Sequence, residues 1–212
     1  MTWSAVVLDA FHTLKPTDPE THWHTPWHAI LDTLFTLEDG FINTLQFQDP
    51  PHFDDLEDTD ISSSSSSTIY VVTTPSQLPV FFVDVKTPEL LADNDDRECT
   101  DLQIRHTFKR IIDRYMRYSL PIPPLFGISA LGTRISIYQY TPERQHIDPP
   151  QLFRIRNTWL GDVAPASRWS HSILMPEGEA KFRAVARETR AMASTAHLTH
   201  QRNGVVAPPN PT

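Results

Sequence analysis

The stretch "PVFFVDVK", residues 79 to 86, constrains the fold more than any other part of the chain. Five of its residues form a near-continuous apolar run: Val80, Phe81, Phe82, Val83 and Val85. Such a run is typical of a strand buried on both faces in the middle of a sheet. Asp84 and Lys86 interrupt its far end, and side-chain alternation places both on one face of the strand. A buried carboxylate needs an ion pair, hydrogen bonds or a metal, so this pair is the first candidate for a site. The simplest alternative is an ion pair at the rim of the sheet, with Lys86 in solvent.

The remaining helices and strands follow from apolar periodicity and turn residues. Residues 23 to 39 are predicted to form the first helix, with Thr25 and Pro26 as its cap and first turn. The pattern then predicts strands over 41–47, 68–74 and 79–86, a helix over 97–118, two strands within 125–140, an added edge strand within 149–156 and a last helix over 176–193.

Three segments fall outside this pattern. Residues 48 to 67 are acidic and then polyserine, without apolar periodicity, and are expected to form a mobile loop. Residues 1 to 22 are expected to be an N-terminal extension, and residues 194 to 212 a disordered tail. Residues 23 to 193 then make one α/β domain, with a central mixed sheet flanked by helices.

The order helix, three strands, helix, strand, with "DVK" closing the third strand, resembles the PD-(D/E)XK nuclease superfamily and its restriction-endonuclease-like αβββαβ core. The resemblance covers roughly residues 23 to 140. A more specific likeness, to a group of uncharacterised, mainly fungal proteins that carry this nuclease-like domain, lies in four stretches: "PVFFVDVKTP", "PIPPLFGISALGTRISIYQY", "DVAPASRW" and "PEGEAKFRAV".

In the nuclease superfamily, two acidic residues hold magnesium and the lysine stabilises developing charge. Carried over to this chain, the resemblance implies that Asp84 and the Val85 carbonyl bind magnesium and that Lys86 is the catalytic lysine. Hard carboxylate oxygens suit this ion, which neutralises phosphate and activates water. The resemblance also implies a polar residue in the long helix facing the site, a position held by Gln103. Glu38, at the end of the first helix, is a candidate for an auxiliary acid, but ordinary solvent exposure before Gly40 is the favoured interpretation.

The superfamily's second acid belongs at the second strand, where this chain reads "SSSSSSTIYVV". The nearest upstream acids are Asp54, Asp55, Glu57, Asp58 and Asp60. This departure favours a non-catalytic or weakened member of the superfamily, acting as a binding or interaction module. The alternative is a magnesium-dependent phosphodiesterase, a nuclease acting on DNA or RNA. The acid at the second strand is the feature that separates the two functions.

Charge is divided unevenly along the chain, whose net charge is -8. Residues 1 to 104 carry 3 basic and 19 acidic residues, whereas residues 105 to 212 carry 15 and 7. The predicted long helix contributes a basic side that is compatible with a nucleic-acid backbone: Arg105, Lys109, Arg110, Arg114 and Arg117. A solvated amphipathic helix is the alternative, and the acidic chain favours it.

The histidines near the N-terminus, the single cysteine and the first residues bear on metal binding, disulfide formation and cellular location. The spacing of His24 and His28 is that of metal ligands on a helix, but Pro26 is predicted to leave His24 outside it, so these histidines and His22 are expected at the surface or in packing. A single cysteine, Cys99, excludes a disulfide within the chain. The start lacks a basic leader, which argues against a secretory signal and favours the cytoplasm or nucleus.

Overall fold

The computed structural model describes residues 3–45, 68–74, 79–118, 120–153 and 162–202. Four α-helices are described: α1 (Ala5–His12), α2 (Glu20–Leu34), α3 (Asn94–Arg117) and α4 (Pro176–Arg202). Two short 3-10 helices are also described: η1 (Pro88–Leu91), between β3 and α3, and η2 (Ala166–Trp169), between β6 and β7. The strands are β1 (Ile42–Leu45), β2 (Thr68–Thr73), β3 (Pro79–Lys86), β4 (Leu125–Leu131), β5 (Arg134–Thr141), β6 (His146–Asp148) and β7 (His171–Ser172).

The strands form one open mixed sheet in the order β1-β2-β3-β4-β5-β6, with β7 paired to β5. The first three are antiparallel neighbours, and β3 and β4 are parallel. A parallel pair needs a crossover, which α3 supplies between these two strands. Asp93 caps this helix by accepting hydrogen bonds from the backbone N–H groups of Asp95 and Asp96, at 2.8 and 3.2 Å. The α/β sheet flanked by helices predicted from the sequence is confirmed, and after α1 the α-helices and strands run in the order α2, β1, β2, β3, α3, β4.

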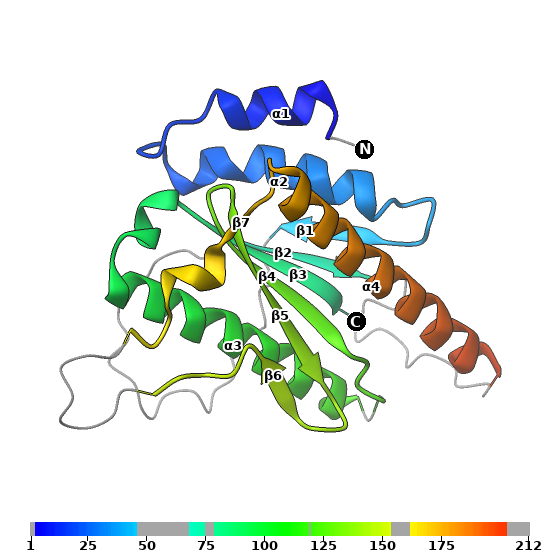
Figure 1. Cartoon of the computed structure of the whole chain (residues 1–212). Helices are drawn as coiled ribbons and strands as arrows, with labels where there is room; N and C mark the ends of the chain where they lie inside the picture. The colour runs from blue at the N-terminus through cyan, green and yellow to red at the C-terminus, as the bar shows by residue number, and fades with distance from the viewer. Residues whose placement is uncertain (1–2, 46–67, 75–78, 119, 154–161, 203–212) are drawn as a thin grey trace, which may run out of the picture.

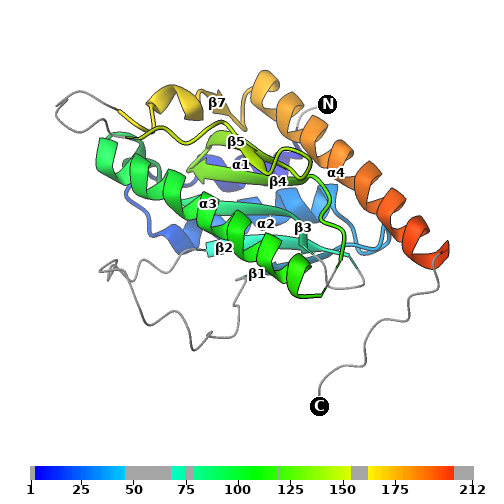
Figure 2. The ribbon, with the colours of Figure 1, turned by 90° about the horizontal axis from the view of Figure 1, so that it is seen from below.

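The helices cover the two faces of the sheet unequally. Figure 1 shows α1 and α2 stacked above the sheet, and in Figure 2, seen from below, α3 lies in front of the strands. Buried residues on the α2 side form one large cluster that extends from Trp3 of the N-terminal segment to Phe182 of α4. A smaller cluster on the α3 side contains Phe82, Phe108 and Tyr138. Residues 81, 83 and 85 of β3 face α2. Side chains alternate along a strand, so Asp84 and Lys86 project from the α3 face of the sheet.

The chain differs from the sequence prediction at several boundaries. The segment predicted as an N-terminal extension contributes to the domain's core, because Trp3, Val7 and Phe11 are buried in the main cluster. Helix α4 continues to Arg202, so residues 194 to 202, predicted to be disordered, are helical. The added edge strand is β6, ahead of the predicted stretch 149–156, whose described residues form no strand. The predicted mobile loop and residues 203 to 212 lie outside the described residues.

Helix α2 begins at Glu20 rather than at residue 23 and contains Pro26 in its interior. A proline inside a helix removes one backbone hydrogen bond and favours a break. Here the side of the helix that carries Pro26 is buried together with Trp23, Trp27 and Ile30. Apolar burial on this side outweighs the local cost, so the first-turn position predicted for Pro26 is wrong and His24 is helical.

Candidate functional site

Asp84 lies in a row of polar side chains that crosses three strands of the sheet. In the strand register it is opposite Ser129 of β4, which is opposite Ser136 of β5. Residues paired in this way project from the same face of a sheet. Asp84 and Ser129 have no exposed surface, and Ser136 is buried as well. The sheet therefore carries a buried polar row on its α3 face, and Asp84 is the acidic member of that row.

The segment around η2 covers this row of side chains. The Trp169 indole donates a hydrogen bond from Nε1 to Ser129 Oγ, at 3.1 Å. The indole is itself buried and packs in a small cluster with Leu131 and Ala164. A serine that accepts a hydrogen bond from a buried indole is held in one orientation. Trp169 thus covers the sheet at the register position next to Asp84.

Lys86 is buried at the end of β3, with 3% of its surface exposed, so the alternative that places this lysine in solvent is wrong. Among the described residues its ion pair is with Glu20 of α2, at 3.8 Å between Nζ and Oε2, rather than with Asp84. The Lys86 carbonyl accepts a hydrogen bond from the N–H of Gly132, at 2.8 Å. The lysine therefore links the end of β3 to the start of α2 and to the β4–β5 turn.

Glu20 is the site residue that the sequence prediction missed. The Pro19–Glu20 step is a local signal for a helix start, because proline is fixed near helical φ and an acid is favourable in a first turn. The Thr25–Pro26 pair, further along the chain, gives the same kind of signal, and the sequence prediction places the helix cap there. Glu38, the candidate auxiliary acid, is exposed beyond the other end of α2, so the solvent exposure favoured for it is confirmed. A 15-residue helix spans roughly 21 Å, so Glu38 is remote from Lys86.

Two histidines of α2 pair with acids one turn away. His24 Nε2 lies 3.9 Å from Glu20 Oε1, and His28 Nδ1 lies 2.9 Å from Asp32 Oδ2. Burial lowers the pKa of His24, and the neighbouring carboxylate of Glu20 raises it by a smaller amount. Within the described ranges no three His, Cys, Asp or Glu side chains come together as a metal site.

Gln103 does not belong to the buried side of α3, which contains Asp101, Ile104 and Phe108. Its side chain is half-buried, and its backbone carbonyl accepts a hydrogen bond from Thr107 Oγ1, at 3.1 Å. The five acids between Asp54 and Asp60 lie outside the described residues. Gln103 therefore lies at the edge of the buried side of α3 and not within it.

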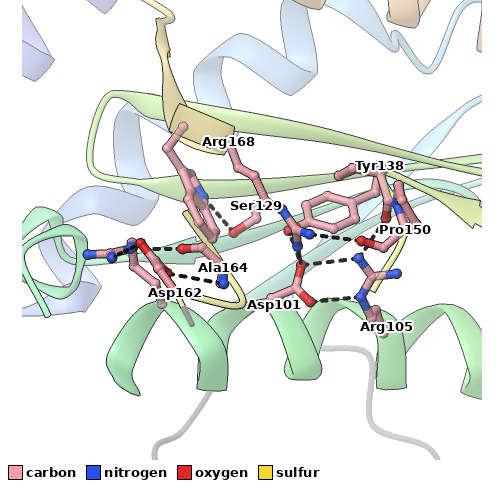
Figure 3. A network of polar contacts seen from close by, with 11 residues as sticks. Asp101, Arg105, Ser129, Tyr138, Pro150, Asp162, Ala164 and Arg168 are labelled. Carbon is pink, nitrogen blue, oxygen red and sulfur yellow. Dashed lines mark hydrogen bonds and ion pairs between the residues drawn. The ribbon is translucent and has the colours of Figure 1, made fainter. Parts of the chain in front are cut away.

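A second polar group lies beside the row, centred on Asp101 of α3 (Figure 3). Its carboxylate accepts hydrogen bonds from the Tyr138 hydroxyl, at 2.7 Å, and from Arg105 Nε, at 2.8 Å. Arg168 of η2 also pairs with it. The two arginines donate in addition to the carbonyls of Pro149 and Pro150, at 2.6 and 2.8 Å. Asp101 therefore holds two chain segments against α3.

Arg97, one turn nearer the start of α3, makes a similar set of contacts. Its guanidinium pairs with Asp162 at 2.6 Å and donates to the carbonyls of Ala164 and Leu91, at 2.9 and 2.8 Å. Arg97 is itself buried. Residues 162 to 169 are thus fixed to α3 at both ends, and this places Trp169 over Ser129.

The predicted basic side of α3 is only partly a surface. Arg105 is turned inward, with 10% of its side chain exposed, because Asp101 and the Pro149 carbonyl take its donors. Lys109 and Arg117 are exposed, whereas Arg110 and Arg114 are half-buried. Arg105 is therefore not available to a phosphate backbone in this structure.

The described residues do not fit a magnesium centre. Asp84 is enclosed, and Val85 is paired on both sides, to Thr68 of β2 and Ala130 of β4, so its carbonyl lies within the sheet ladder. Magnesium needs an octahedral set of oxygens and keeps several waters, for which an enclosed carboxylate leaves no room.

Comparisons of the chain with protein-family models, with curated proteins and with solved structures give no match. No helix in the described ranges has the combined length and apolar character needed to cross a bilayer.

Proposed function

We propose that this chain is a non-catalytic binding module built on a nuclease-like αβββαβ core, in which Asp84 and Lys86 are structural residues. The observation that carries this proposal is the burial of both side chains, Asp84 within the polar row beside Ser129 and Lys86 beside Glu20 of α2. Hydrolysis of a phosphodiester needs a metal, a water and the phosphate to meet at one accessible place. Asp84 instead belongs to a closed polar row, and Lys86 ties β3 to Glu20 of α2.

The burial of Asp84 has a structural explanation that requires no substrate. The α3 face of the sheet already contains buried charge at Asp101 and Arg97, each held by several hydrogen bonds. A carboxylate in that layer continues a pattern of directional contacts between strands, helix and the η2 segment. Such contacts favour one arrangement of the elements over others.

Between the two partner classes, protein and nucleic acid, charge favours protein. The chain carries a net charge of -8, and Arg105 is engaged inside the fold. Affinity for nucleic acid comes mainly from neutralised phosphates, so an acidic chain whose Arg105 is already engaged is poorly suited to it. Fluorescence anisotropy with labelled single- and double-stranded DNA and RNA is expected to show no salt-dependent binding.

The cleavage assay tests the proposal directly. The full chain is incubated with DNA or RNA in the presence of magnesium or manganese, beside the variants Asp84→Asn, Lys86→Met and Asp113→Asn. Asp113, half-buried on α3, is the control carboxylate. We expect no cleavage by any of the four proteins. Cleavage by the natural chain and by Asp113→Asn, lost in Asp84→Asn and Lys86→Met, would establish the magnesium-dependent phosphodiesterase instead.

A further inference from the structure

Strand β1 lies at one end of the sheet and, in the described part of the chain, is paired only with β2. The outer backbone groups of an edge strand are a template for another strand. Natural edges are commonly protected by charged residues or proline, and the sequence of β1, "INTL", contains neither. Ile42 and Leu45 are 40% and 49% exposed, and Leu37, just before the strand, is 77% exposed.

The two faces of β1 offer different chemistry. Asn43 points toward α2, because its Nδ2 donates to Asp32 Oδ1 at 2.8 Å and to the Phe35 carbonyl at 3.0 Å. Ile42, one residue earlier, projects from the opposite face of the strand. A strand added beside β1 would therefore have one set of side chains next to α2 and the alternate set next to Ile42.

An open pocket of about 450 Å³ lies on this side of the molecule, between the end of α2 and the start of β1. Its lining includes the carboxylates of Asp32 and Glu38, the exposed Leu37 and the ring of His28. Asp32 already pairs with His28, whereas Glu38 is exposed to solvent. The pocket is therefore acidic at its rim, and a cationic side chain is the complementary occupant.

We propose that the edge of β1 binds an extended segment of a partner protein in which basic and apolar residues alternate. The segment adds a strand beside β1, with its basic side chains toward Asp32 and Glu38 and its apolar side chains against Ile42. Backbone hydrogen bonds supply affinity in this mode, and the alternating side chains supply selectivity. This inference gives the partner of the binding module proposed above and rests on that proposal.

The probe is a fluorescein-labelled peptide of alternating lysine and valine, with its binding to the full chain followed by anisotropy. We expect saturable binding by this peptide and none by a glutamate–valine peptide of the same length. A lysine–proline peptide, which keeps the charge but cannot pair as a strand, is also expected to fail. Equal binding of the lysine–proline and lysine–valine peptides would overturn strand addition, and no binding of the lysine–valine peptide would overturn the site.

Variants of the chain locate the site. Glu38→Lys should weaken binding roughly 3- to 10-fold, the range expected for reversing a rim charge. Ile42→Lys should weaken it at least as much, since a charge then meets the apolar residues of the peptide. Val6→Lys, on α1, is the matched control at another exposed apolar residue and should leave binding unchanged. Thermal unfolding of each variant verifies that it is folded.

Other occupants of the edge give different results. A self-associating chain whose dimer is disrupted by Ile42→Lys would place a second copy on the edge and contradict the partner proposal. Binding that appears only after residues 48 to 67 are removed would show that the chain's own segment occupies it. Failure of peptide binding without metal-dependent cleavage rejects this partner alone, whereas cleavage that depends on Asp84 rejects the binding module itself.

Discussion

Helices α1, α2 and α4 cover one face of the sheet with aromatic residues, whereas α3 and the η2 segment cover the other with rings and buried charges. On the first face the rings of Trp27 and Phe81 each lie less than 6 Å from the ring of Phe182, with centroids 5.7 and 5.9 Å apart. On the second face Phe82 packs on Phe108, and arginine–aspartate pairs lie beside them.

This difference between the two faces gives the buried aspartate and lysine at the end of β3 a structural explanation. Apolar packing is not directional, so an isolated carboxylate on the α2 face would be costly. The α3 face is organised by hydrogen bonds to Asp101 and Arg97, and the row of Asp84, Ser129 and Ser136 belongs to that layer. A buried aspartate in such a layer has a structural role available to it, and Lys86 at the same strand end pairs with Glu20 of α2, so catalysis is not needed to explain either residue.

The largest expected loss of stability comes from a substitution in the aromatic face of the sheet. Trp27→Ala removes a fully buried ring and the hydrogen bond from its Nε1 to the Gly132 carbonyl, at 3.1 Å. We expect a loss of about 3–5 kcal/mol in the free energy of unfolding, measured with urea. Val6→Ala, at an exposed residue of α1, is the control and should change little. A loss below about 1 kcal/mol for Trp27→Ala would mean that this face does not form the main core.

Asp101→Asn tests the charged face. The substitution leaves Arg105 and Arg168 buried without their anion, and breaking such a pair costs about 3 kcal/mol or more. Asp113→Asn on the same helix is the matched control and should stay within about 0.5 kcal/mol of the natural chain. Equal effects of the two substitutions, measured by urea unfolding, would show that the network does not contribute to stability.

Gly127→Ala probes how closely the rings of the α3 face approach the sheet. A Cβ at this position would lie 2.7 Å from Phe82 Cε1 and 2.9 Å from Phe108 Cε2, inside van der Waals contact. Overpacking of this kind costs about 1–3 kcal/mol. The double variant Gly127→Ala/Phe82→Leu should recover part of the lost thermal stability, because leucine frees space. No recovery would assign the effect to the Phe108 ring or the backbone rather than to the Phe82 ring.

The contact between Lys86 and Glu20 should contribute less. At 3.8 Å, with Glu20 partly in solvent, its coupling free energy is expected to be about 1 kcal/mol or less. A double-mutant cycle with Lys86→Met and Glu20→Gln measures this quantity by urea unfolding. A coupling of several kcal/mol would show a much more strongly desolvated pair and would make Glu20 a principal residue of the strand end.

The smallest effect concerns pH. Because burial lowers the pKa of His24 below 6.5, the unfolded chain binds its proton more tightly than the folded chain does. The free energy of unfolding should therefore fall as the pH drops through and below 6.5, and His24→Gln should flatten that dependence. His106→Gln, at an exposed position of α3, is the control. The same pH dependence in both variants would exclude His24 as its source.

The fold could be predicted largely because its strands carry strong local patterns. The apolar run of β3 and the β-branched residues of β2 needed no long-range information. The start of α2 was misplaced because Pro26 has a clear local meaning that tertiary burial overrides. The Asp101–Arg168 pair joins residues 67 positions apart and leaves no periodic signal, so the network escaped prediction. Lys86 was identified, but its partner Glu20 depends on where α2 begins.

The most direct test of the central claim, that Asp84 is structural, is the melting temperature of the full chain with and without magnesium or manganese. A ligand that binds only the folded state raises stability by mass action. We predict no shift with either ion for the natural chain, and a lower melting temperature for Asp84→Asn whether or not metal is present. A rise with metal in the natural chain that Asp84→Asn abolishes, and that Asp113→Asn keeps, would contradict the account and identify Asp84 as a metal ligand.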